Sequence, residues 1–501
     1  MTNAAPIILD LPDESATVRL GEDLAMALRP GDVIALHGDL GMGKSTLARA
    51  IIRAIVNDDG LEVPSPTFTL VQSYPLRIPV HHFDLYRLSE AEELEELGLT
   101  DALADGIALV EWPERAPAYF STAIHVKLSE LGDGRRVEID APAPARTRVA
   151  HALEVRAFLD RAGYAGAARR FMLGDASVRA YETIEPVAGN RLILMDAPQR
   201  SNEPVIRDGL PYSRIAGLAQ SVTAFVGVAN GLRAKGFSAP KIFAMDLDAG
   251  LLLIEHLGEV PFLMPDGSVN AGRYEEAGRL LAALHQHQWP RIMPVVEGVQ
   301  HVVPSYDRPA FEIEAELLLD WYLPFVKGRA ATDQERKDFR RLWEPLITRL
   351  LASEQSLVLR DYHSPNLIWR EECERLDRLG IIDVQDAVFG PAAYDVASLG
   401  YDARVDVPVE VERAVVEAYC ASRASAFDRE AFEEAYAITA AHRNTKILGI
   451  FIRLAQRDGK SGYLKHLPRI RTYLRRALAH PSLADLRAYY EVQGFLDGEQ
   501  A

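Results

Sequence analysis

Residues 38–45 read Gly-Asp-Leu-Gly-Met-Gly-Lys-Ser, which is the spacing of a Walker A phosphate-binding loop. The apolar run before it, residues 33–37, predicts a buried strand, and a helical pattern opens at Lys44. Glycines at these positions let backbone N–H groups turn toward the phosphates of a nucleotide, and the helix N-terminus adds its partial positive charge. We expect Lys44 to balance the charge of the β- and γ-phosphates and the Ser45 hydroxyl to reach Mg²⁺. The stretch predicts an α/β domain with a P-loop.

Two carboxylates follow apolar runs further along this domain. Asp84 comes after residues 80–83, and Glu111 comes after residues 107–110. A P-loop enzyme needs carboxylates at the ends of neighbouring strands to hold Mg²⁺ and to orient water. We therefore predict that both are catalytic and that Glu111 is also a metal ligand, although strand ends often carry solvated acids. Trp112 could belong either to the core or to a mobile lid.

Four motifs of this region stand in a fixed order, namely GDLGMGKST, SPTFTLV, HHFDLYRL and LVEWPER. Together they resemble the TsaE-type ATPases of bacterial tRNA threonylcarbamoyladenosine synthesis, over roughly residues 7 to 140. The resemblance implies a small ATPase whose nucleotide cycle supports tRNA threonylcarbamoyl-transfer proteins, which modify adenosine 37 of certain tRNAs. It adds Thr67 in the SPTF segment, Trp112 in the VEW segment and, less securely, Thr17. The ATP contacts expected in this domain are Thr17, Gly38, Asp39, Leu40, Gly41, Met42, Gly43, Lys44, Ser45, Thr46, Thr67 and Trp112.

A second site is predicted in the other half of the chain. The sequence Leu-Arg-Asp-Tyr-His-Ser-Pro-Asn occupies residues 359–366 after an apolar strand, and Gly-Ile-Ile-Asp follows at 380–383. Phosphoryl transfer to an alcohol needs one carboxylate to accept the hydroxyl proton and further oxygen ligands for the Mg²⁺ that bridges the phosphates. Asp361, Asn366 and Asp383 together supply that set of groups. Each Asp alone would suit a cap or a turn, so the prediction depends on the ordered trio.

Two weaker motifs lie upstream of this trio. A Gly-containing loop at residues 174–181 could cover the phosphates of ATP, and Glu-His-Leu-Gly at 255–258 could form the hinge against adenine. A hairpin turn with glycine is more often only a turn, so the order of the motifs carries this prediction. The ATP contacts expected here are Gly174, Ser177, Arg179, Glu255 and Leu257.

The order of these motifs resembles the aminoglycoside phosphotransferase and choline kinase superfamily. More narrowly, GDASVRAY, LMDAP, IIDVQDAVFGPAAYD, RNTKILGIF and RDGKSGYLKHLPR resemble the AmgK-type kinases of N-acetylmuramate and N-acetylglucosamine, over about residues 151 to 495. The resemblance implies ATP-dependent phosphorylation of the anomeric hydroxyl of the sugar in peptidoglycan recycling. By motif match it implies that Asp361 is the base, that Asn366 and Asp383 are the metal ligands, and that Asp395 is a structural residue behind the loop. Two alternatives stay open: a kinase of another small alcohol, such as an aminoglycoside or a choline-like compound, and a pseudokinase that regulates the ATPase.

One position departs from the kinase pattern. Met195 or Asp196 stands where kinase-like proteins usually have the Lys that holds the phosphates of ATP, and no acidic residue occurs between Asp208 and Asp246 to pair with such a Lys. The loss of both partners avoids an unpaired charge and favours a rearranged site over an inactive one. We predict that Arg179 replaces the missing Lys.

Length and composition fit this two-part reading. The chain has 501 residues, 48% of them hydrophobic and 25% charged, which suggests two to four globular domains. Alternating Ala and Pro at 141–147 predict an extended linker. We therefore expect an α/β P-loop NTPase domain at 1–140, a linker at 141–150, and an α+β two-lobed protein-kinase-like (aminoglycoside phosphotransferase-like) domain. Its N-lobe is placed at 151–259 and its C-lobe, with a helical substrate-binding region, at 260–501.

Net charge and cysteine content bear on partners and location. Lys and Arg total 55 against 72 Asp and Glu, so the formal charge is −17. Such a field repels nucleic acid and anionic membranes, so we expect the contact with tRNA to be indirect and no membrane association. The two cysteines and the acidic N-terminus favour a cytoplasmic protein. A local basic stretch is expected to be a solvated face or to attract an anionic substrate; it comprises Arg443, Asn444, Lys446, Arg453, Arg457 and Lys460.

Overall fold

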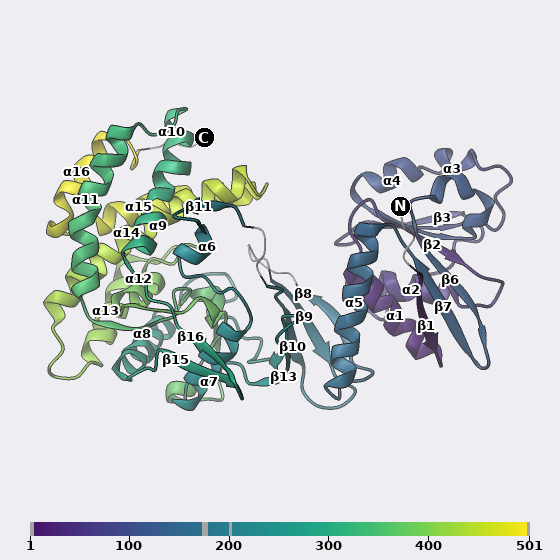
Figure 1. The fold of residues 1–501 in the computed structure, drawn as a ribbon, viewed down its shortest axis with the longest axis horizontal. Helices are drawn as coiled ribbons and strands as arrows, with labels where there is room; N and C mark the ends of the chain where they lie inside the picture. The colour runs from purple at the N-terminus through teal and green to yellow at the C-terminus, as the bar shows by residue number, and fades with distance from the viewer. Residues whose placement is uncertain (1–4, 173–178, 200–202, 498–501) are drawn as a thin grey trace. The chain divides into compact units, whose positions relative to one another are not determined.

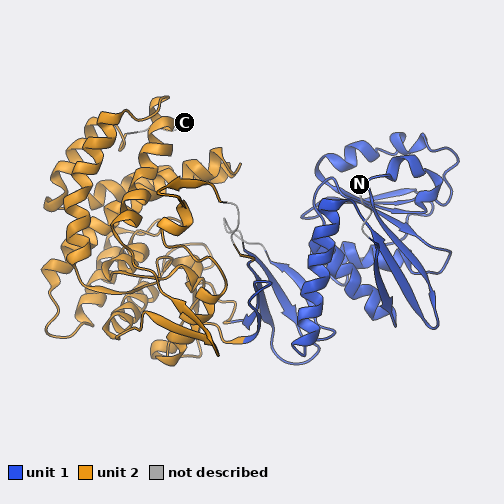
Figure 2. Ribbon diagram, in the orientation of Figure 1, with its two compact units in different colours: residues 1–197, 243–256 blue, residues 198–242, 257–501 orange. Residues whose placement is uncertain are grey.

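The computed structural model describes residues 5–172, 179–199 and 203–497 (Figure 1). Their contacts divide the chain into two compact units (Figure 2). The first unit comprises residues 1–197 and 243–256, and the second comprises 198–242 and 257–501. None of the helices in the described part of the chain combines the length and the apolar character that a membrane span needs.

A seven-stranded sheet forms the centre of the first unit. The sheet is mixed: its three central pairs of neighbouring strands are parallel, and its three outer pairs are antiparallel. The α/β P-loop class expected from the sequence is confirmed. In sheet order the strands are β1 (Ile7–Leu11), β7 (Gly134–Asp140), β6 (Ile124–Leu131), β2 (Val33–His37), β5 (Ile107–Glu111), β4 (Val80–Asp84) and β3 (Val71–Tyr74).

Helices cover both faces of this sheet. Because successive side chains of a strand point to opposite faces, Leu36 packs in the core cluster of one face and Ala35 in that of the other. The first face lies under α1 (Glu14–Ala27), α2 (Lys44–Val56) and the start of α5 (Ala143–Arg161), and the second contains residues of α3 (Glu93–Glu96) and α4 (Leu99–Asp105). Two 3₁₀ turns, η1 (Pro113–Arg115) and η2 (Pro117–Phe120), follow β5.

The expected extended linker is wrong, because α5 begins within it. Pro142 is the N-cap, Pro144 lies in the first turn, and the backbone N–H of Arg146 already donates to the carbonyl of Pro142 at 2.9 Å. Proline is tolerated in a first helical turn, where its missing N–H has no helical partner, and the alternating alanines favour helix. The domain limits at 140 and 151 stay a prediction.

A five-stranded sheet with antiparallel pairs follows in the chain. Helix α5 packs on both sheets: Val149 belongs to the core of the seven-stranded sheet, whereas Phe158 and Leu159 belong to the core of the five-stranded sheet. One continuous helix is therefore shared by the two hydrophobic cores. The strands, in sheet order, are β13 (Ile242–Asp246), β14 (Leu251–Glu255), β10 (Leu192–Asp196), β9 (Ala180–Glu185) and β8 (Ala168–Met172).

The second unit is mostly helical, and short two-stranded ladders flank the 359–366 loop. Strand β17 (Gln355–Val358), which pairs with β20 (Val388–Pro391), precedes the loop, and the ladder of β18 (Leu367–Trp369) with β19 (Leu379–Ile381) follows it. The long helix α14 (Arg429–Gln456) is buried along its middle. The other elements are β11 (Val205–Arg207), β12 (Leu210–Pro211), α6 (Tyr212–Ile215), α7 (Thr223–Ala234), α8 (Ala271–Gln286), β15 (Ile292–Val296), β16 (Val299–Val302), α9 (Arg308–Leu317), η3 (Leu318–Tyr322), α10 (Leu323–Lys327), α11 (Asp333–Ala352), η4 (Ser364–Asn366), η5 (Arg375–Asp377), η6 (Val384–Asp386), α12 (Ala393–Gly400), α13 (Val409–Ala421), η7 (Ser461–His466), α15 (Leu467–Ala477), η8 (Pro481–Leu483) and α16 (Ala484–Val492).

Candidate active sites

The predicted phosphate loop joins β2 to α2 in a conformation that requires glycine. Gly38 has φ 138° and Gly43, the N-cap of α2, has φ 100°. A Cβ on Gly38 would lie 2.7 Å from the carbonyl oxygen of Leu128, so a side chain there would collide with backbone. The glycines therefore serve both the backbone turn and the close approach of β6.

Lys44 is buried at the first turn of α2. Its ammonium donates to the carbonyls of Gly38 (2.6 Å) and Asp39 (3.0 Å) and lies 3.6 Å from the ring centroid of Trp112. Burial lowers the pKa of Lys44, and the nearby carboxylate of Glu111 opposes this shift. Trp112 packs on the core of one sheet face and also covers Lys44, at a left-handed φ of 60°. A strained aromatic residue at this position suits a nucleotide contact.

The two predicted carboxylates are direct neighbours, because the register of β4 with β5 pairs Asp84 with Glu111. Glu111 Oε2 accepts from the Ser45 hydroxyl at 2.9 Å, and Asp84 Oδ2 accepts from the Ser65 hydroxyl at 3.1 Å. Both carboxylates are almost wholly buried. Hydroxyl and carboxylate oxygens at the start of α2 are the ligands that Mg²⁺ prefers, so this set fits the ion.

Sequence reasoning missed His82, the neighbour of Glu111 on the other side. Its Nε2 lies 3.0 Å from Glu111 Oε1, and its Nδ1 is buried with no hydrogen-bond partner in the described structure. The available signal was the alternation of β4, which puts His82 and Asp84 on the same side of the strand.

A pocket of about 570 Å³ brings most of the predicted residues of this domain together. Gly38, Asp39 and Met42 are not among its lining residues, and the two carbonyls of Gly38 and Asp39 instead hold Lys44. Thr17 lies buried on α1 and does not line the pocket either. The predicted residues that do line it are Leu40, Gly41, Gly43, Lys44, Ser45, Thr46, Thr67, Asp84, Glu111 and Trp112.

The second predicted site lies on the loop after β17. Asp361 keeps 41% of its side chain exposed, whereas Arg360 before it is buried in a left-handed conformation with φ 68°. The buried carboxylate of Asp395 accepts the backbone N–H groups of Leu359 (2.7 Å) and Arg360 (2.8 Å). Asp395 thus supports the strained turn that presents Asp361.

Hydrogen bonds connect Asn366 and Asp383 to the same loop. The Asn366 amide nitrogen donates to the carbonyl of Asp361 at 3.0 Å, and the carbonyl of Asn366 accepts from the N–H of Ile382 at 3.0 Å. Gln385 donates to Asp383 Oδ1 at 2.6 Å, and Asp383 has φ 58°. An amide oxygen is among the ligands that Mg²⁺ accepts, so the residue type of Asn366 fits a magnesium ligand.

His363, which sequence reasoning also missed, lies beside the predicted base. It is buried, its Nε2 is 3.8 Å from Asp361 Oδ1, and its Nδ1 has no hydrogen-bond partner in the described residues. Burial lowers the pKa of His363, against the opposing charges of Asp402 and Asp361. Asp402 accepts hydrogen bonds from the backbone N–H groups of Ser364 and Arg404, both at 2.8 Å. The bond from Ser364 anchors the 359–366 loop.

A buried ionic cluster lies behind Arg360. Its guanidinium donates to Glu314 and to the carbonyl of Ala216, and Lys446 Nζ lies 3.0 Å from Glu314 Oε2. Lys446 also donates to the hydroxyl of Tyr394 at 2.8 Å. Burial opposes ionisation of Glu314, but Lys446 and Arg360 hold its pKa at about 2. The cluster links α9 and α14 to the 359–366 loop.

The expectation of a solvated basic face is therefore wrong for part of α14. Arg443, Asn444 and Lys446 are buried, and Arg443 donates to the carbonyl of Tyr401 at 3.2 Å. Arg453 is partly buried, with its guanidinium 4.9 Å from the ring centroid of Tyr212. The middle of α14 is enclosed by other helices, so its cations serve the interior.

The ATP contacts predicted in the N-lobe fall in several places. Gly174 and Ser177 lie outside the described residues, and Arg179 stands half-buried just before β9. Glu255 ends β14 opposite Leu192. Leu257 is buried in the second unit, where a Cβ on Gly380 would lie 3.0 Å from its side chain. These assignments stay predictions.

The position of the missing Lys is taken by a different pair. Met195 is buried, and Asp196 Oδ2 lies 2.7 Å from Nε2 of His151 on α5. This hydrogen bond raises the pKa of His151. Asp196 therefore has a partner of its own within the first unit.

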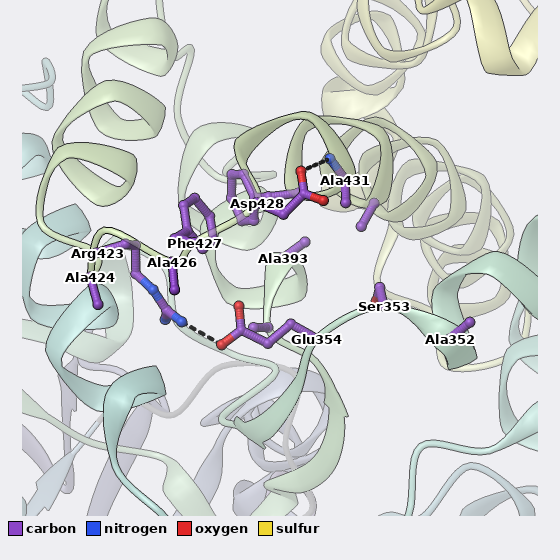
Figure 3. Close-up of a pocket in the computed structure, with 13 residues that line it drawn as sticks. Ala352, Ser353, Glu354, Ala393, Arg423, Ala424, Ala426, Phe427, Asp428 and Ala431 are labelled. Carbon is purple, nitrogen blue, oxygen red and sulfur yellow. Dashed lines mark hydrogen bonds and ion pairs between the residues drawn. The ribbon is translucent and has the colours of Figure 1, made fainter.

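Another pocket, of about 450 Å³, is lined mainly by small side chains and two aromatic rings (Figure 3). Arg423 and Glu354, which both line it, form an ion pair, and Asp428 Oδ1 accepts from the N–H of Ala431 at 3.0 Å, as Figure 3 shows. None of its lining residues belongs to the 359–366 loop, so it is distinct from the predicted phosphoryl-transfer site.

Fold and sites define the class: a P-loop NTPase domain followed by a protein-kinase-like phosphotransferase domain. A family model described as threonylcarbamoyl adenosine biosynthesis protein TsaE matches residues 11–137, and a model of the phosphotransferase enzyme family matches residues 169–434. The chain belongs to the phosphotransferase enzyme family, and its first part belongs to the TsaE family.

Relatives of both parts are separate proteins. An N-acetylmuramate/N-acetylglucosamine kinase of Caulobacter vibrioides is 34% identical over 345 residues, covering 67% of this chain and 94% of the relative. A tRNA threonylcarbamoyladenosine biosynthesis protein TsaE of Rickettsia felis is 37% identical over 132 residues, covering 26% of this chain and 77% of the relative. Among solved structures, an ethanolamine kinase of Plasmodium vivax covers 69% of this chain and 91% of its own, at 12% identity and a TM-score of 0.43.

Proposed function

We propose that the chain is a bifunctional enzyme. Its P-loop domain, residues 1–140, hydrolyses ATP in support of tRNA threonylcarbamoylation, and its kinase domain phosphorylates the anomeric hydroxyl of N-acetylmuramate or N-acetylglucosamine. The observation that supports this most directly is the presence of two separate phosphoryl-transfer sets. One comprises Lys44, Ser45 and Glu111, and the other Asp361, Asn366 and Asp383. Each set lies in a segment related to proteins named for the corresponding activity.

In the P-loop domain, Lys44 would exchange its backbone carbonyl partners for phosphate oxygens. Ser45 and Glu111 would hold Mg²⁺, which supplies charge stabilisation when bound, and Asp84 beside Glu111 would orient the attacking water. The acidic net charge of −17 supports action through threonylcarbamoyl-transfer proteins and not by direct contact with tRNA. A role in tRNA modification supports a cytoplasmic location.

In the kinase domain, Asp361 would accept the proton of the anomeric hydroxyl as that oxygen attacks the γ-phosphorus of ATP. The bond from the γ-phosphorus to the leaving oxygen of ADP breaks, giving the sugar 1-phosphate and ADP. The carboxylate of Asp361 is partly exposed, which suits a base that meets a substrate from solvent. The residue before it, Arg360, is buried and held by Asp395. Asn366 and Asp383 would hold Mg²⁺, and Arg179 would contact the phosphates in place of the missing Lys.

A substrate panel tests the kinase assignment. The purified chain is given ATP and Mg²⁺ with N-acetylmuramate, N-acetylglucosamine, kanamycin or choline, and Asp361→Asn is the matched variant. Transfer restricted to the aminosugars and lost in Asp361→Asn supports the proposal. Transfer to kanamycin or choline alone would assign the domain to another small alcohol, and no transfer to any of the four would favour a pseudokinase.

The P-loop assignment has its own test. Copurification of the chain with threonylcarbamoyl-transfer proteins is compared with ATP, with ADP and without nucleotide. Retention that depends on the nucleotide supports a role in that complex. No retention in any of the three conditions would indicate a nucleotide switch with other partners.

A further inference from the structure

Asn57, the C-cap of α2, makes a two-sided hydrogen-bonded pair with the backbone of Phe171 in β8. Its side-chain nitrogen donates to the Phe171 carbonyl at 2.8 Å, and its side-chain oxygen accepts from the Phe171 N–H at 3.1 Å. Strand β8 is the edge of the five-stranded sheet, with β9 on one side only. Asn57 thus satisfies the outward N–H and C=O of an edge strand, as a neighbouring strand would.

Further contacts hold the same strand from the same side. Arg77 lies 3.5 Å from the ring centroid of Phe171, and Arg170 pairs with Asp59, which follows α2. Asn57, Asp59 and Arg77 belong to the segment matched by the TsaE model, whereas Arg170 and Phe171 belong to the segment matched by the phosphotransferase model.

A buried ionic network lies at the start of β8. Arg169, only 1% exposed, donates to Asp23 on α1 at 2.8 Å and to Glu182 on β9 at 2.7 Å. Arg156 on α5 donates to Asp23 and Glu22, both at 3.0 Å. Removing the P-loop domain would leave both arginines without the α1 carboxylates, and an unpaired buried charge is costly. The buried ion pairs of Arg156 and Arg169 therefore join the P-loop domain to the segment that contains β8.

We propose that the P-loop domain positions β8 for the kinase reaction, with Asn57 as the main positioning residue. The proposal rests on the kinase activity proposed above. Strand β8 pairs with β9, and β9 begins directly after the predicted ATP contact Arg179, so a displaced Phe171 should weaken ATP binding more than sugar binding. In this protein, Asn57 of the P-loop domain thus takes the place of a neighbouring strand along β8 of the kinase domain.

Variants of Asn57 separate positioning from folding, because the side chain is exposed and its backbone is left-handed with φ 59°. Asn57→Gly keeps that conformation and removes the amide, while Asn57→Asp keeps the acceptor and loses the donor. Asp10→Ala, which breaks the exposed pair of Asp10 with Arg136, is the matched control in the same domain.

The experiment measures aminosugar phosphorylation by the full-length protein. We expect Asn57→Gly to raise the KM for ATP about tenfold, with kcat, the KM for sugar and the melting temperature nearly unchanged. Asn57→Asp should give an intermediate KM, and Asp10→Ala the wild-type value. An unchanged KM for ATP in Asn57→Gly, or an equal loss in the Asp10→Ala control, overturns the proposal.

A second readout does not need the sugar substrate. In a Lys44→Ala background, which removes nucleotide binding at the P-loop, the Kd of a fluorescent ATP analogue reports on the kinase domain. If the wild-type protein phosphorylates no aminosugar, the proposed kinase function is refuted, but the positioning role of Asn57 is not. The Kd would still rise about tenfold with Asn57→Gly if the positioning role is correct, and an unchanged Kd would refute it.

Discussion

His82 Nε2 on β4 lies 3.0 Å from Oε1 of Glu111 on β5, and both side chains are almost completely buried. The other carboxylate oxygen of Glu111 accepts from Ser45, so each oxygen has one partner. These two contacts fix the orientation of the carboxylate toward the start of α2, and His82 makes one of them.

We expect His82→Leu to lower the kcat of ATP hydrolysis roughly tenfold, the effect typical of losing the partner of a metal-ligating group. His82→Gln, which can still donate to Glu111, should recover most of the activity. The measurement is steady-state hydrolysis in the Asp361→Asn background, with nucleotide affinity followed in parallel. Equal losses in the Leu and Gln variants would show that packing, and not the hydrogen bond, is what matters.

Asp361→Asn is expected to lower sugar phosphorylation by about 10²- to 10⁴-fold, because the amide cannot accept the hydroxyl proton. The substitution preserves shape, and the side chain is partly exposed, so the melting temperature should not change. ATP hydrolysis that depends on Lys44 should persist. Phosphorylation at the wild-type rate would remove Asp361 from the role of base.

Sequence alone predicted the parts of both sites that are contiguous in the chain. The P-loop and the 359–366 segment carry their own turn chemistry, so the residues around Lys44 and Asp361 could be assigned from spacing. Asp84 and Glu111 required a guess about which strands are neighbours, and the parallel pairing of β4 with β5 confirms that they adjoin. His82 was missed because its partner is distant in sequence.

Two segments misled sequence reasoning for identifiable reasons. Residues 143–147 combine proline with alanine, and the prolines fall where a helix tolerates them, so the segment became the start of α5. Lys446 reads as a surface charge on α14, but its partner Glu314 comes from a separate helix and both are buried. Charge pairing between distant elements leaves no local pattern.

The pair of Glu314 with Lys446 yields a stability prediction. Glu314→Gln should lower the free energy of unfolding by about 3–5 kcal/mol, because Arg360 and Lys446 would remain buried without their anion. Lys446→Met should cost less, since it leaves the neutral pair of Glu314 and Arg360. Urea unfolding of the full chain measures both. If the double variant Glu314→Gln/Lys446→Met is no more stable than Glu314→Gln, the two side chains do not interact as described.

His442 on α14 should make stability depend on pH. Its Nε2 lies 2.8 Å from the carbonyl of Phe311, and the rings of Phe311 and Trp343 surround it. Burial lowers the pKa of His442 to about 4, with Lys446 and Arg360 acting in the same direction and Glu314 opposing them. The imidazole is therefore neutral in the folded protein at pH values where the unfolded chain, with a pKa near 6.5, already binds a proton.

Because the unfolded state binds more protons between these two pKa values, the free energy of unfolding falls as pH drops from about 6.5 toward 4. The contribution of His442 over this window is about 3 kcal/mol and does not grow further below pH 4. His442→Asn, which can still donate to Phe311, should flatten the pH dependence of urea unfolding between pH 6.5 and 4.5. It should leave the dependence above pH 7 unchanged, since the imidazole is neutral in both states there. An identical slope in the variant and the wild type would mean that His442 does not stay neutral in the folded protein.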